Sequence, residues 1–231
     1  MVTAGHSAQH PTEAATEARL VTLTPEVLLR AYACGVFPMA RSRQDPRLYW
    51  IDPQERGVLP LDGFHVPRSL FKVLRREVFE VRCDSDFAGV LAGCAETAPD
   101  RPETWINDEI TGLFTQLHHL GLAHSVESWH NGRLVGGLYG LALGGAFFGE
   151  SMFSRATDAS KVALAHLVAR LRKGGFTLLD TQFVTDHLRR FGAIEIPKAT
   201  YLEKLAAAMN QGAHFPVDMT PDEVVELVRG S

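Results

Sequence analysis

The chain has few cysteines and no long apolar run. Its three cysteines, Cys34, Cys83 and Cys94, are an odd number without close C-x-x-C spacing, which argues against a disulfide framework and against a zinc site. No apolar run approaches the roughly 20 residues that a membrane span needs. With 45% hydrophobic and 22% charged residues, the composition is typical of a globular protein with a sizeable core. We expect a protein of the reducing cytoplasm that does not enter a membrane.

The beginning of the chain also lacks a secretory signal. Residues 1–18 contain no apolar segment, and Glu13 and Glu17 lie among small polar residues. We interpret residues 1–20 as a disordered leader. The formal net charge of −4 argues against indiscriminate nucleic-acid binding, although it leaves room for a local basic patch.

Several common catalytic motifs are missing. The sequence has no G-x-x-x-x-G-K-[ST] phosphate loop, no G-x-S-x-G nucleophile turn and no H-E-x-x-H metal helix. The histidines are scattered. His118 and His119 are adjacent on a predicted helix and so point to different faces, while His124 and His187 are better explained as hydrogen-bonded structural residues.

Capping residues, turns and periodicity divide the chain into two unequal parts. In the first part we predict helices over 24–35, 66–77 and 86–97, and strands over 48–51, 58–61 and 79–83, with 58–61 as the partner of 48–51. In the second part we predict helices over 108–120, 158–172, 185–191, 198–209 and 221–228, and strands over 123–129, 133–143, 146–153 and 176–182. Asn131-Gly132 forms a two-residue hairpin turn. A meander followed by helix, strand and helix predicts an α+β fold with a mixed, mostly antiparallel sheet.

A few polar residues lie at the ends of apolar strands. Glu150, in the stretch G-E-S-M-F-S-R from Gly149 to Arg155, follows an apolar, glycine-rich strand. A carboxylate beside a core is either paired structurally or available to a substrate. Asp180 and Gln182 end another strand, and residues two apart share a face. They form either one site or a cap for loop amides.

A second set is aromatic and basic. Trp50 follows a predicted basic loop and Trp105 lies in another loop, where indoles can stack on a nucleobase or pack on the core. Four basic residues share helical spacing and could contact phosphates, although a solvated face is the default explanation. They are Arg68, Lys72, Arg75 and Arg76.

Together these motifs resemble the bacterial leucyl/phenylalanyl-tRNA–protein transferase family over most of residues 24–205. The motifs are Tyr32 to Pro38, Trp50, Phe64 to Ser69, Thr104 to Ile106, His124 to Glu127, Leu134 to Gly140, Gly149 to Arg155, Asp158 to Lys161, Asp180 to Gln182 and Ile196-Pro197. Their common order makes the resemblance specific.

The resemblance implies an enzyme that transfers Leu, Phe or Met from aminoacyl-tRNA to the α-amine of proteins beginning with Arg or Lys. The product carries a destabilising N-terminus for regulated degradation. It further implies a small α/β N-terminal domain, residues 21–83, followed by a GNAT-type acyltransferase domain, residues 84–231. Neither a metal nor a coenzyme is expected, and we expect a monomer.

The resemblance also assigns site residues. Trp50 and Trp105 would surround the terminal adenosine. Five apolar residues would line the aminoacyl pocket: Leu138, Phe147, Leu167, Leu171 and Leu179. Glu150 and Asp180 would attract the basic N-terminal residue of the acceptor, and Gln182 would orient the attacking amine. Whether Asp180 or the terminal ribose of the tRNA takes the proton of that amine stays open.

The chain departs from the family pattern in places, and two rival functions stay open. Many members have W-W-S-P-D-P-R where this chain has Y-W-I-D-P-Q-E-R, and leucines stand at 167 and 171 where bulkier aromatics occur. The preference among Leu, Phe and Met therefore stays open. One rival is an acyl-coenzyme A transferase, which would need a glycine-rich pyrophosphate loop that residues 154–158 lack. The other is a non-catalytic RNA-binding module.

Overall fold

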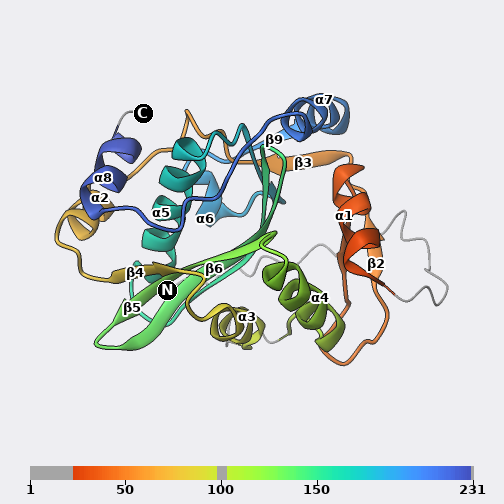
Figure 1. Cartoon of the computed structure of the whole chain (residues 1–231), viewed down its shortest axis with the longest axis horizontal. Helices are drawn as coiled ribbons and strands as arrows, with labels where there is room; N and C mark the ends of the chain where they lie inside the picture. The colour runs from red at the N-terminus through yellow and green to blue at the C-terminus, as the bar shows by residue number, and fades with distance from the viewer. Residues whose placement is uncertain (1–22, 98–102, 230–231) are drawn as a thin grey trace, which may run out of the picture.

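The computed structural model describes residues 23–97 and 103–229 (Figure 1). The predicted leader, residues 1–20, lies outside the described residues. The helices are α1 (Pro25–Ala33), α2 (Arg68–Arg75), α3 (Phe87–Ala95), α4 (Asp108–His119), α5 (Ala159–Lys173), α6 (Asp186–Arg189), α7 (Lys198–Met209) and α8 (Pro221–Arg229). The strands are β1 (Phe37–Met39), β2 (Tyr49–Ile51), β3 (Glu55–Val58), β4 (Glu80–Cys83), β5 (Ala123–His130), β6 (Arg133–Leu143), β7 (Ala146–Ser154), β8 (Leu178–Gln182) and β9 (Ile194–Pro197).

The described residues form one large sheet of seven strands in the order β4-β5-β6-β7-β8-β3-β9. Its neighbouring strands pair antiparallel except β7 and β8, which are parallel and joined through α5. This confirms the predicted α+β fold with a mostly antiparallel sheet.

A hydrophobic core lies on each face of the sheet. The first core packs α1, α3, α4 and α7 against one face, and the second core packs α2, α5 and α8 against the other. Figure 1 shows α2, α5 and α8 gathered on one side of the strands, with α3 and α4 on the other. Neighbouring residues of β6 divide between them, since Tyr139 belongs to the first core and Leu138 to the second. Such double burial explains why β6 and β7 read as apolar runs rather than as alternating strands.

Local signals are confirmed where they act over short range. Thr24 caps α1, its hydroxyl accepting a hydrogen bond from the Val27 amide at 3.4 Å. The hairpin between β5 and β6 turns at Asn131 and Gly132, whose φ angles of 51° and 71° fit the favoured two-residue turn.

The predicted partner of the strand at 48–51 is wrong. β2 instead pairs with β1, for which no strand was predicted, while β3 lies between β8 and β9. Sequence proximity favoured a hairpin, but β3 finds its partners more than 100 residues away, where its Arg56 reaches Asp180. β9 was not predicted, because Ile194–Pro197 is only four residues long and ends in a proline, which is too short a stretch for a strand period to be recognised.

The division of the chain at residue 83 stays a prediction. β3 and β4, which precede this point, lie in the same sheet as the strands that follow it.

Candidate active site

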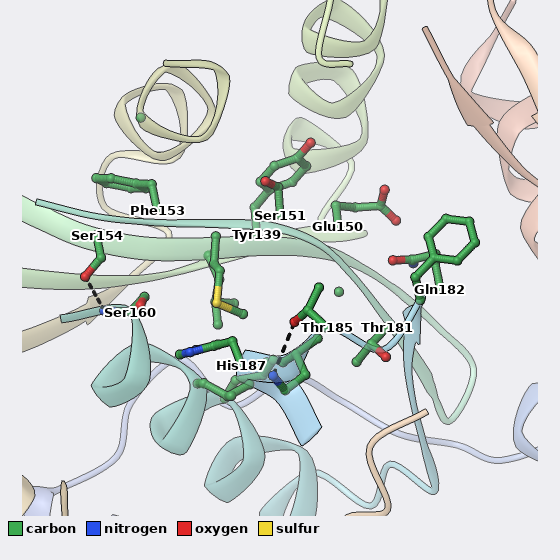
Figure 2. Close-up of a pocket in the computed structure, with 18 of the residues that line it drawn as sticks. Tyr139, Glu150, Ser151, Phe153, Ser154, Ser160, Thr181, Gln182, Thr185 and His187 are labelled. Atoms are coloured by element: carbon green, nitrogen blue, oxygen red, sulfur yellow. Dashed lines mark hydrogen bonds between the residues drawn. The ribbon is translucent and has the colours of Figure 1, made fainter. Parts of the chain in front are cut away.

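The site begins where two parallel strands separate. β7 pairs with β8 only from Ala146 to Phe148, opposite Leu178 to Asp180, although β7 continues to Ser154. Beyond Phe148, β7 therefore has β6 on one side and an open edge on the other. A cavity of about 810 Å³ occupies this opening. It is bounded on one side by residues 149–155, which form the end of β7 and the residue after it, and on the other side by the segment after β8. Figure 2 shows Glu150 and Gln182 at one end of the cavity, Ser154 and Ser160 at the other, and His187 on the facing wall.

The cavity extends around the open edge of β7 from one face of the sheet to the other. The aromatic lobe, on the side of the first core, is lined by Phe37, Met39, Trp105, Tyr139 and Phe153. The leucine lobe, on the side of the second core, is lined by Leu138, Met152, Leu164, Leu167, Leu179 and Leu188. A ligand with two chemically different ends can therefore bind across the edge, with its middle beside β7.

Glu150 is positioned by a β-bulge. Tyr139 of β6 lies opposite Ser151 and Gly140 lies opposite Gly149, so Glu150 is an extra residue in β7 without a partner. The bulge also shifts the alternation of side chains between the two faces of the sheet. Phe148 and Phe153 are five residues apart and would face opposite sides in a regular strand, yet both lie in the first core. Gly140 permits this geometry, since a Cβ there would lie 2.3 Å from the Phe148 carbonyl oxygen. A bulge of this kind re-aims a side chain toward the open edge of the strand.

The Glu150 carboxyl is half-buried and accepts a hydrogen bond at 2.8 Å from the Tyr32 hydroxyl of α1. Burial raises the pKa of Glu150 to about 8; the charge of Asp180 acts in the same direction, whereas the Tyr32 hydrogen bond and Arg56 oppose it. At neutral pH the carboxyl is therefore mostly protonated. A cation bound beside it would favour the carboxylate, so the site is suited to a basic ligand group.

Gln182 is positioned by a second backbone irregularity. As the last residue of β8 it has a φ of 56°, in the left-handed region that non-glycine residues seldom adopt. In the amide orientation that satisfies its neighbours, its side-chain nitrogen donates to the Gly149 carbonyl oxygen at 2.7 Å, which bridges the gap between the separating strands. Gly57 of β3 permits the turn, because a Cβ there would lie 2.6 Å from the Phe183 carbonyl carbon.

Asp180 does not line the cavity. Its carboxylate is completely buried and forms an ion pair with Arg56, with Nε at 3.0 Å from Oδ1 and Nη2 at 2.7 Å from Oδ2. It also accepts hydrogen bonds from the Tyr201 hydroxyl at 2.6 Å and from the backbone N–H of Gln182 at 2.7 Å. The Asp180 carboxylate therefore contacts Arg56, Tyr201 and the backbone of Gln182, and it lies outside the lining of the cavity.

Arg56 was not singled out from the sequence, yet it connects several elements. Its Nη1 donates to the Gly35 carbonyl at 2.9 Å, and its guanidinium lies over the rings of Phe37 and Tyr201 at 4.4 and 4.6 Å. Nothing in the local pattern of β3 marks this arginine as buried; only the distant carboxylate explains it.

Of the residues predicted to bind aminoacyl-adenosine, the structure brings four to the cavity: Trp105, Leu138, Leu167 and Leu179. Phe147 and Leu171 lie behind this wall, fully buried in the second core. Trp50 lies half-buried on β2, opposite Pro38, whose two neighbours line the aromatic lobe.

The four basic residues lie on or next to α2 and are all exposed, while Leu70 and Leu74 of the same helix face the second core. The structure thus provides the predicted basic face, made of Arg68, Lys72, Arg75 and Arg76. Contact of this face with tRNA stays a prediction.

Three cavity residues were missed as site residues. Tyr139 Oη, Thr181 Oγ1 and His187 Nε2 are buried, and no residue that the structure describes hydrogen-bonds them. Tyr139 lies in an apolar strand whose pattern predicts only core residues. For His187, a hydrogen-bonded structural role was the better explanation from the sequence. Buried polar atoms normally have partners, so these three atoms are candidates to pair with polar groups of a ligand.

Within residues 23–97 and 103–229, no cluster of three or more His, Cys, Asp or Glu side chains could hold a metal ion. Across the same ranges, no helix is both long enough and apolar enough to span a membrane.

Two family models identify the chain as an aminoacyltransferase. The model described as leucyl/phenylalanyl-tRNA protein transferase matches residues 58–206, and the one for the N-terminal domain of the same proteins matches residues 22–54. The chain belongs to the leucyl/phenylalanyl-tRNA–protein transferase family.

Relatives of the same name agree with this assignment. The chain is 64% identical to the leucyl/phenylalanyl-tRNA–protein transferase of Paramagnetospirillum magneticum, covering 89% of this chain and 99% of that protein. It is 62% identical to the one of Rhodospirillum rubrum, covering 90% and 97%. Among solved structures, the C-terminal DUF2156 domain of a "Putative Lysylphosphatidylglycerol Synthetase" from Agrobacterium fabrum has a TM-score of 0.35 at 12% identity, covering 83% of this chain and 59% of that one. A likeness this weak does not establish a shared fold.

Proposed function

We propose that the protein transfers Leu, Phe or Met from aminoacyl-tRNA to the α-amino group of proteins that begin with Arg or Lys. The observation that carries the proposal is the cavity itself. An apolar lobe, an aromatic lobe and a carboxyl group meet at the open edge of β7, where Gln182 lies. The two substrates of such a transfer carry an apolar side chain, an adenosine and a cationic residue. Each of these groups needs a binding surface of its own kind.

The leucine lobe receives the transferred side chain. Leu138, Leu167 and Leu179 present an apolar surface there, and burial of a Leu, Phe or Met side chain contributes about 1.5–3 kcal/mol. Phe147 and Leu171 pack behind the lining and set the depth of the lobe. Side chains branched at Cβ are disfavoured by shape, although a size difference alone discriminates only modestly.

The aromatic lobe receives the terminal adenosine. The indole of Trp105 lines this lobe, and Trp50 lies on the strand next to it. Stacking of a base on an aromatic side chain contributes about 1–3 kcal/mol. The exposed basic face of α2 contacts phosphates of the tRNA body and supplies affinity without reading sequence.

The reaction is aminolysis of an ester. The α-amino nitrogen of the acceptor attacks the ester carbonyl carbon, the new C–N bond forms, and the C–O bond to the terminal ribose breaks. The proton lost by the amine passes to the ribose oxygen that leaves. Gln182, tied to Gly149 across the gap, orients the amine, and orientation of this kind can supply effective molarities on the order of 10⁵ M or more. We assign Asp180 to positioning Gln182, because it accepts a hydrogen bond from the backbone N–H of Gln182 and its charge is paired with Arg56.

Glu150 selects the acceptor. It lies at the same end of the cavity as Gln182 (Figure 2), so a basic side chain at the N-terminus can reach the carboxyl while the α-amine faces the ester. The cation restores the ionised form of a carboxyl that burial otherwise keeps protonated.

The finer fold assignment belongs to the same proposal. A parallel pair joined through α5 that separates after three residue pairs supports a GNAT-type acyltransferase domain. A monomer in the cytoplasm, a product marked for degradation and the absence of a cofactor stay predictions.

Transfer of labelled Leu or Phe from tRNA to an Arg-initiated peptide tests the proposal. We expect product with Arg and Lys acceptors and none with an acidic N-terminus. The variant Gln182→Ala separates a transferase from an RNA-binding module, since it should lose transfer while still binding charged tRNA. Failure of the wild-type protein with both basic acceptors would overturn the proposed function.

A further inference from the structure

His187 lies on the wall of the cavity that faces β7 (Figure 2). The side chain lies on α6, and its buried Nε2 has no hydrogen-bond partner among the described residues. Its ring meets the edge of Phe191 at 5.2 Å, and Phe191 is itself stacked on Phe64 at 5.8 Å. Thr185 caps α6, accepting a hydrogen bond from the Leu188 amide at 3.3 Å. Packing therefore fixes the direction of the imidazole before any ligand arrives.

The surroundings keep this imidazole uncharged. Burial lowers the pKa of His187, and the positive charges of Lys161 and Arg190 act in the same direction. A neutral imidazole has one N–H donor and one nitrogen that accepts. A buried polar atom left unpaired costs about 1–3 kcal/mol, so a ligand group that pairs with Nε2 gains that stabilisation on binding.

The proposed function restricts which ligand group this can be. If the transferred side chain fills the leucine lobe, its ester carbonyl must face Gln182 and the incoming amine at the edge of β7. The remaining polar group on the same Cα atom is the α-amino group, which is left to the facing wall, where Figure 2 shows His187. The charges of Lys161 and Arg190 disfavour an ammonium ion there, so this amine binds in its neutral form.

We propose that Nε2 of His187 accepts a hydrogen bond from the α-amino group of the amino acid being transferred. The protein thereby distinguishes an aminoacyl ester from an acyl ester with the same side chain. This inference rests on the proposed function, and it assigns His187 a contact with the donor substrate.

Three charged tRNAs test it, carrying phenylalanine, 3-phenyllactate or 3-phenylpropionate on the same ribose oxygen. The first two have a donor at the α position and the third has none. We expect wild-type protein to use the phenylpropionyl ester with kcat/KM at least about tenfold lower than the phenylalanyl ester, with the phenyllactyl ester between them. His187→Phe should bring the three values together, and His187→Asn should restore part of the difference. His119→Phe, at an exposed position of α4, is the matched control and should keep the wild-type ratio.

The outcomes separate the two proposals. If wild-type protein transfers no phenylalanine, the proposed function fails. If it transfers phenylalanyl and phenylpropionyl groups equally well, the inference about His187 is overturned without any variant. An unchanged ratio in folded His187→Phe overturns it as well. If that variant does not fold, as judged by its thermal melting, the wild-type comparison and His187→Asn decide.

Discussion

Replacement of Glu150 by Gln should abolish a specific pH dependence of acceptor binding. Desolvation of this half-buried carboxyl raises its pKa to about 8. If only the carboxylate binds a cationic side chain, the apparent Kd scales with one plus the ratio of proton concentration to the acid constant. For a pKa of about 8 this factor is close to one at pH 9 and about 30 at pH 6.5. Wild-type affinity for an Arg-initiated peptide should therefore fall by about 30-fold across this range.

The assay is titration of an Arg-initiated peptide without tRNA, so that no transfer occurs. The peptide's own α-amine titrates near pH 8, which affects wild type and variant alike, so the ratio of their Kd values isolates residue 150. In Glu150→Gln the affinity should be weak, and the ratio of its Kd to that of wild type should rise with pH. A ratio that stays constant from pH 6.5 to pH 9 would refute the assignment of Glu150 to the acceptor.

The same shift predicts a change in stability. Between pH 4.5 and about 8 the unfolded chain releases the Glu150 proton while the folded chain retains it, so wild type loses stability relative to Glu150→Gln as pH rises through this window. Below pH 4.5 the carboxyl is protonated in both states, and above pH 8 the difference is constant. We expect the Tm difference between variant and wild type to grow between pH 4.5 and pH 8 in calorimetry, whereas a difference independent of pH would contradict the raised pKa.

Three further predictions concern the supports of the site. Gly57→Ala should reduce transfer by tenfold or more at a stability cost of about 1–3 kcal/mol, because its Cβ would displace the turn that carries Gln182. Gly112→Ala is the control, since a Cβ at this position meets no atom of the described residues within 4 Å. Equal activity of the two variants would contradict the role of the turn. Arg56→Met should lower the free energy of unfolding by about 3–5 kcal/mol in urea titration, since it leaves the Asp180 charge buried and unpaired; a loss below 1 kcal/mol would show that the pair is dispensable. Replacing Arg75 and Arg76 by Gln should weaken tRNA binding and reduce the salt slope by about 0.7–0.9 for each phosphate that the variant no longer neutralises, whereas Lys204→Gln on α7 should not; an unaltered slope would exclude this face.

The helices and the central hairpin could be predicted because their signals are local. Thr24, Asn131 and Gly132 act within a few residues, and apolar periodicity shows the helical faces. The position of β3 could not be predicted in this way, because its partners depend on contacts with β8 and β9 far along the chain.

Some residues of the candidate site could likewise be predicted from local signals, and others could not. Glu150 and Gln182 were identifiable as polar residues at the ends of apolar strands. The bulge and the left-handed turn that aim them depend on Gly140 and Gly57 of neighbouring strands, so no local pattern shows them. Tyr139 and His187 became candidates only when the cavity showed that their buried polar atoms have no partner among the described residues.

The buried guanidinium of Arg56 has a consequence for how the chain can be divided. It lies between the segments matched by the two family models, residues 22–54 and 58–206, and it binds the end of α1 through Gly35, the first strand through Phe37, and α7 through Tyr201. Removing the N-terminal segment would deprive the Arg56 guanidinium of the Gly35 carbonyl and the Phe37 ring, while its ion pair with Asp180 would remain. The two matched segments are therefore not interchangeable modules. We expect them to unfold in a single cooperative transition, and chimeras between relatives should keep residues 35, 37, 56, 180 and 201 from one parent.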